Sequence, residues 1–131
     1  MRARRTPFLL VARLKWPLQL ISGYSGGVWI LAVSGRAGRA SAGVLGQELH
    51  AAASRGDLRI VLDLAGLDYI SGAALQTVDS AEVRLKNGGG RLVLCCVTPA
   101  VRVTLDIAGF GHRFVIEPTR EAAVARAKLL G

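Results

Sequence analysis

Two apolar runs separated by a helix-length segment constrain this chain more than any other feature. The first, LRIVLDLAG at 58–66, is nearly continuous and contains β-branched residues, and RLVLCCV at 91–97 has the same character. Such runs are typical of strands that are buried on both faces of a parallel sheet. The intervening residues 72–86 carry leucine and valine at helical spacing. Together the three pieces predict a β-α-β crossover with a helix packed against the sheet.

The rest of the chain continues this alternation. Two strands joined by a tight turn are expected before the crossover, and a helix follows them. After the second apolar run, Thr98 and Pro99 predict the start of a short helix, and Gly109 predicts its end. The expected flanking elements are strands at 18–24, 28–35 and 113–117 and helices at 41–54 and 120–130. The order β-β-α-β-α-β-α-β-α predicts a single α/β domain, with a mixed, mostly parallel sheet of about five strands and about four helices packed against it.

The charge of the chain is concentrated at its N-terminus. Five of the 17 basic residues lie in residues 1–16, which contain no acid, so the rest carries 12 basic against 9 acidic residues, a net charge of only +3. Since no recognition motif accompanies this charge, we expect no direct binding of nucleic acid. We interpret 1–17 as a basic arm or extension and 18–131 as the folded domain.

The arm contains the apolar run PFLLVA, which ends before Arg13 and Lys15 and is too short to span a bilayer. No integral membrane segment is therefore expected. Three interpretations of the arm remain open: an extra strand or poorly ordered arm, weak contact with an anionic membrane surface, and an extension from a misassigned start codon.

Catalytic and metal-binding patterns are missing from the sequence. It contains no nucleophile elbow, no Walker A lysine and no zinc-protease motif, so we expect neither an enzyme nor a cofactor. Cys95 and Cys96 are adjacent within a predicted strand, where neighbouring side chains point to opposite faces and are badly placed to form a disulfide. We interpret them as small buried hydrophobic residues in a reducing compartment, with no metal site.

The stretch LDYISGAALQ at 67–76 predicts a loop that leads into a helix. Ser71 can cap this helix, and the small residues that follow leave its N-terminus uncovered. The free N–H groups and the positive end of the helix dipole would then be open to another chain. This end of the helix is the best candidate for a binding surface.

The same stretch carries part of a family resemblance. Residues 24–127 resemble the STAS domain of bacterial anti-sigma factor antagonists, most strongly in IVLDLAGLDYIS, NGGGRLVL and VTPAVRVTLDIAGFGHRF. The resemblance implies a cytoplasmic regulatory protein that binds an anti-sigma factor with a kinase-like ATP-binding fold and so frees a sigma factor. A STAS accessory subunit of a membrane lipid-transport ATPase complex is the alternative function.

In such antagonists the partner kinase phosphorylates a serine at the start of the second helix. By resemblance, Ser71 takes the position before this acceptor, Gly72 the acceptor position, Ala73 and Ala74 the next two, and Leu75 the position of a leucine. Because glycine has no hydroxyl group, either the chain binds without a switch at this site or Ser71 is a substitute acceptor. We favour the first alternative, since the hydroxyl of Ser71 is expected to cap the helix.

The expected partner-binding surface combines this loop with the preceding loop SGRAGRAS. The resemblance and the residue pattern together assign to it Asp68, Tyr69, Ser71, Gly72, Ala73, Ala74, Leu75, Arg36 and Arg39.

Overall fold

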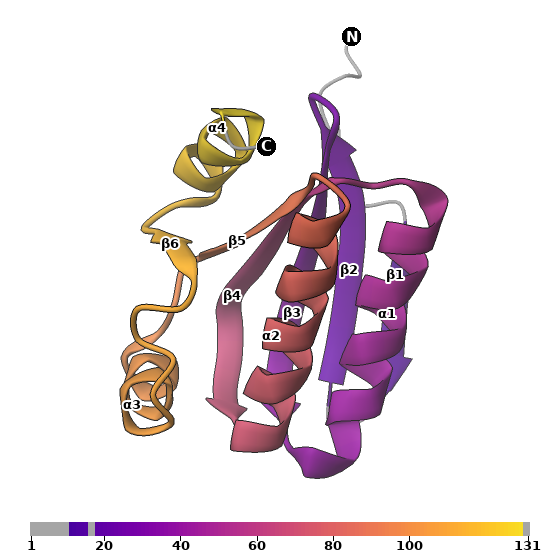
Figure 1. The fold of residues 1–131 in the computed structure, drawn as a ribbon. Coiled ribbons are helices and arrows are strands. Elements are labelled where there is room, and N and C mark those ends of the chain that lie inside the picture. The colour runs from indigo at the N-terminus through magenta and orange to yellow at the C-terminus, as the bar shows by residue number, and fades with distance from the viewer. Residues whose placement is uncertain (1–10, 16–17, 130–131) are drawn as a thin grey trace, which may run out of the picture.

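A computed structural model describes residues 11–15 and 18–129, which form one mixed sheet with helices on both faces (Figure 1). The six strands lie in chain order: β1 (Val11–Lys15), β2 (Leu18–Ser25), β3 (Val28–Ala37), β4 (Arg59–Ile70), β5 (Arg91–Cys95) and β6 (Val115–Glu117). The β1–β2 and β2–β3 pairs are antiparallel, and the three later pairs are parallel. The predicted α/β class and its mostly parallel sheet are confirmed.

Three helices contribute to the core on one face of the sheet, and a fourth packs on the other. The helices are α1 (Ala42–Arg55), which follows the short 3₁₀ helix η2 (Arg39–Ser41), and α2 (Gly72–Asn87), α3 (Pro99–Ile107) and α4 (Arg120–Leu129). Figure 1 shows α1 and α2 side by side in front of the sheet. Apolar residues of α3 belong to the same core as α1 and α2, whereas α4 packs on the opposite face.

Alternating side chains of β4 and β5 build both cores. Ile60 and Leu62 lie in the α1–α2 core, and Val61 between them lies in the α4 core. Leu94 and Val93 of β5 divide in the same way. All five side chains are at most 1% exposed. This two-sided burial explains why both runs are apolar almost throughout.

Three details differ from the predicted elements. The segment expected as a loop at 67–70 is extended and belongs to β4, which pairs with the end of β3 after shifts of register. β5 ends at Cys95, because Cys96 has a φ of +59° and leaves the strand. The sheet also gains a sixth strand, since β1 pairs with the free edge of β2 and satisfies its backbone groups. β1 lies within the segment that we interpret as an arm.

Within residues 11–15 and 18–129, no helix combines the length and the apolar character that crossing a membrane requires.

Backbone crowding governs the connection from α2 to β5. The Gly90 N–H donates to the Leu85 carbonyl at 2.7 Å, and the Arg91 N–H donates to the Leu58 carbonyl at 2.7 Å. A Cβ atom on Gly90 would collide with the Leu58 carbonyl oxygen and lie 3.1 Å from its carbon. Gly88 is different: its φ is −96°, and the nearest atom to an added Cβ is 3.6 Å away. Of these two glycines, Gly90 alone is closely packed against backbone.

Gly90→Ala is expected to lower the free energy of unfolding by about 1–3 kcal/mol, because the Leu58 backbone has to move to admit the methyl group. Gly88→Ala is the matched control and should leave stability unchanged or raise it by up to about 1 kcal/mol. Urea denaturation measures both. Equal midpoints for the two variants would contradict the close approach at Gly90.

Candidate functional site

The candidate surface forms where β3 and β4 end together. The two strands are parallel, with Arg36 paired to Tyr69 and Ala37 to Ile70. The Ser71 N–H then donates to the Ala37 carbonyl at 2.8 Å, which extends the ladder to the first residue after β4. In Figure 1 this is the lower end of the sheet, where α2 begins. Loops at the carboxyl ends of parallel strands commonly form binding sites in α/β folds.

Ser71 caps α2, as the sequence predicts. Its backbone is extended, with φ −87° and ψ 164°, and its Oγ accepts a hydrogen bond from the Ala74 N–H at 3.1 Å. The first turn of α2 contains no acidic residue, so no neighbouring carboxylate in that turn neutralises the positive end of the helix dipole. The start of α2 therefore presents a partial positive charge.

Nothing in the local geometry requires glycine at position 72. Gly72 is the first residue of α2, it is exposed, and its φ lies outside the left-handed region. No heavy atom lies within 4 Å of the position that a Cβ would occupy. A side chain here would point into open space, so serine would fit as well as glycine. The backbone conformation therefore does not explain why a residue with a hydroxyl group is absent from this position.

Two arginines flank the start of α2. The guanidinium of Arg36 lies over the Tyr69 ring, 4.6 Å from its centroid, and both side chains are exposed. At an exposed site such a cation–π contact contributes about 0.5–1 kcal/mol and fixes the orientation of the arginine. Arg39 begins η2 and is exposed, as is Asp68 on the other strand. The surface thus carries two positive charges and one negative charge beside the helix dipole.

Ala74 and Leu75, which the sequence assigns to the partner surface, lie in the core instead. They are 0% and 1% exposed and pack among the apolar residues beneath α1 and α2. Ala73 is half-buried, as is Ser71. The buried pair anchors the first turn of α2, and the other seven assigned residues, which are exposed or half-buried, remain candidates for a partner surface.

An apolar strip on α3 was not predicted from the sequence. Thr98 Oγ1 donates to the Leu67 carbonyl at 3.2 Å and accepts from the Val101 N–H at 3.3 Å, which places the start of α3 beside β4. One turn apart on this helix, Val103 and Ile107 are 55% and 82% exposed. The spacing of Val103 and Ile107 in the sequence could have predicted this strip, since the two residues lie one turn apart on the face opposite the buried Val101.

Comparison with known proteins supports the family resemblance. The family model described as "Mlab, STAS domain" matches residues 24–117. BtrV of Bordetella bronchiseptica, whose name marks it as a candidate anti-sigma factor antagonist, is 41% identical over 102 residues. This match covers 78% of the present chain and 88% of BtrV.

Solved structures share the fold. An anti-sigma factor antagonist from Mycobacterium paratuberculosis superposes with a TM-score of 0.77 at 21% identity, covering 88% of this chain and 99% of that one. The antagonist SpoIIAA in its unphosphorylated form gives 0.71 at 17% identity, with 86% and 98% covered. SpoIIAA of Bacillus in its phosphorylated form gives 0.63 at 16% identity, with 82% and 97% covered.

Ser71→Ala is expected to lower the free energy of unfolding by about 1 kcal/mol, because the Ala74 N–H loses its acceptor. Ser80→Ala, at an exposed position in the middle of the same helix, should change stability by less than about 0.5 kcal/mol. Thermal and urea unfolding of both variants provide the measurement. A Ser71→Ala protein as stable as the control would show that the cap contributes nothing.

Proposed function

This chain belongs to the STAS domain family, and we propose that it acts as an anti-sigma factor antagonist that binds a kinase-type anti-sigma factor and thereby frees a sigma factor. The observation that carries the proposal is the match to BtrV over 102 residues, and the family model matched at residues 24–117 spans β3, β4 and α2 and so includes the candidate surface. The solved relatives are named as antagonists rather than as enzymes.

The contact is proposed to centre on the start of α2. Gly72 presents no side chain, so the backbone of a partner can approach the uncovered end of the helix. Arg36 and Arg39 stand beside it and can pair with carboxylates of the partner. This combination favours a partner segment that is acidic.

We propose that phosphorylation at the usual acceptor position does not switch off binding in this chain. Gly72 has no acceptor oxygen, and the Oγ of Ser71 one residue earlier is half-buried and bonded to the Ala74 N–H. Modification of Ser71 would require this hydroxyl to leave its capping geometry. The chain would therefore hold its partner whether or not the kinase is active.

Capture of the tagged full chain from a lysate of its host identifies the partner. We expect to recover a protein with a kinase-like ATP-binding domain. After purification, that protein should bind the chain directly. Recovery of permease and ATPase subunits without such a protein would instead support the accessory-subunit function.

Gly72→Asp is expected to weaken binding of the captured anti-sigma factor by about tenfold or more, because it adds a negative charge where an acidic partner segment docks. Folding should not suffer, since an acid in the first turn stabilises a helix by about 0.3–1 kcal/mol. Gly72→Asn is the matched control, equal in size but neutral. Titration calorimetry compares the three proteins, and equal affinities for the Asp and Asn variants would contradict charge repulsion at this site.

Incubation with the captured kinase and ATP should add no phosphate to the native chain. Gly72→Ser should gain one phosphate, because the added side chain meets no atom within 4 Å of its Cβ. Intact-mass spectrometry counts the phosphates, and Ser71→Ala in the Gly72→Ser background assigns the position. Stoichiometric phosphate on Ser71 of the native chain would overturn constitutive binding.

A further inference from the structure

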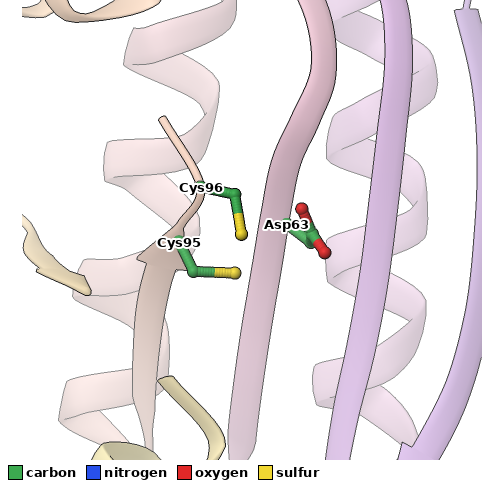
Figure 2. A group of neighbouring side chains, drawn as sticks. All are labelled: Asp63, Cys95 and Cys96. Atoms are coloured by element: carbon green, nitrogen blue, oxygen red, sulfur yellow. The ribbon is translucent and has the colours of Figure 1, made fainter. Parts of the chain in front are cut away.

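Three side chains with metal-binding atoms meet where β4 and β5 lie side by side. Asp63 of β4 is the register partner of Cys95, and Cys96 follows at the end of β5. One ligand atom from each side chain lies within 4.8 Å of the other two. Figure 2 shows both sulfur atoms directed toward the strand that carries Asp63. Asp63 and Cys95 are 6% and 0% exposed, and Cys96 is half-buried.

An unusual backbone conformation brings the two thiols together. In an extended strand, Cys95 and Cys96 would point to opposite faces, as the sequence analysis predicts. Instead Cys96 has a φ of +59°, the one positive value at a non-glycine residue within 11–15 and 18–129. Both cysteines consequently lie on the α4 side of the sheet. A turn alone would favour glycine at such a position, so the presence of cysteine calls for another explanation.

The carboxylate of Asp63 is held in place from both sides. Its Oδ1 accepts the Ala65 N–H at 2.9 Å, and its Oδ2 accepts the guanidinium of Arg120 at 2.9 Å. Bonds of this kind orient a metal-ligating group in many sites. With both thiols ionised, the carboxylate, the two sulfurs and the guanidinium carry a net charge of −2, which a divalent cation would neutralise. Burial raises the pKa of both thiols, so a cation has to displace their protons.

We propose that Asp63, Cys95 and Cys96 form a binding site for a thiophilic divalent cation of the Zn²⁺ and Cd²⁺ class. Two sulfurs and one carboxylate oxygen suit such ions and leave a fourth position for water. Zinc–sulfur bonds of about 2.3 Å place two sulfurs about 3.8 Å apart, so a small rotation of the half-buried Cys96 closes the site. Because Cys96 is only half-buried, an ion can reach the site from its side. The site does not depend on the proposed antagonist function.

The test titrates the full chain with Cd²⁺ under reducing conditions and follows the ultraviolet charge-transfer absorption of cadmium thiolate. Zn²⁺ affinity is then measured by competition with a chelating dye. We expect one ion per chain. Cys96→Gly should lower the affinity by about tenfold or more, because it removes a ligand while glycine accepts the same backbone conformation. Circular dichroism checks that this variant is folded.

Two variants in α4 test whether the charge next to the cluster affects metal affinity, as binding at this site requires. Arg120→Gln removes the positive charge that opposes a cation at this site, while the Ala65 N–H still holds Oδ1 of Asp63, and should raise the affinity for Zn²⁺. Arg126→Gln removes an arginine that pairs with Glu117 and should leave it unchanged. Absence of the charge-transfer band in the native chain, or equal affinity in native and Cys96→Gly proteins, would overturn the proposal.

Discussion

Burial of β4 on both faces is the constraint on which the rest of this structure depends. A strand that is covered on two sides needs a helix layer on each, and the parallel pairing with β3 and β5 needs crossovers that supply them. The alternation of Ile60, Val61 and Leu62 between two cores ties α1 and α2 to one face and α4 to the other. Slippage of β4 by one residue would exchange these faces and break both cores at once.

The central position of β4 also explains where function can reside. Its carboxyl end places Tyr69 and Ser71 where the central strands end, beside Arg36 from the end of β3. Ala74 and Leu75 then anchor α2 from below, so the first turn is rigid although its outer side is bare. A preorganised surface of this kind loses little conformational entropy when a partner binds. We therefore regard the burial beneath the candidate site as part of the proposed binding mechanism.

The sequence predicted the elements well because their signals are local. Apolar runs, the Ser71 and Thr98 caps and the glycines after α2 each specify structure within a few residues. What it missed depends on contacts between distant segments: the extension of β4 through 67–70 requires β3 as a partner. Cys96 lies close to Asp63 because its φ angle is positive, and no pattern of residue types in the sequence predicts that angle. The family resemblance predicts a binding loop, but only packing shows which of its residues face outward.

The two edges of the sheet are protected in different ways, and this affects how the chain behaves on its own. At one edge β6 has only three residues, too few to template pairing with another molecule. At the other, β1 pairs with residues 18–22, five of the eight residues of β2, whose backbone groups would otherwise be open. A shortened protein beginning at residue 18 would present that eight-residue edge to its neighbours and tend to aggregate. By pairing with β2, the N-terminal strand β1 thus limits self-association of the chain through that strand.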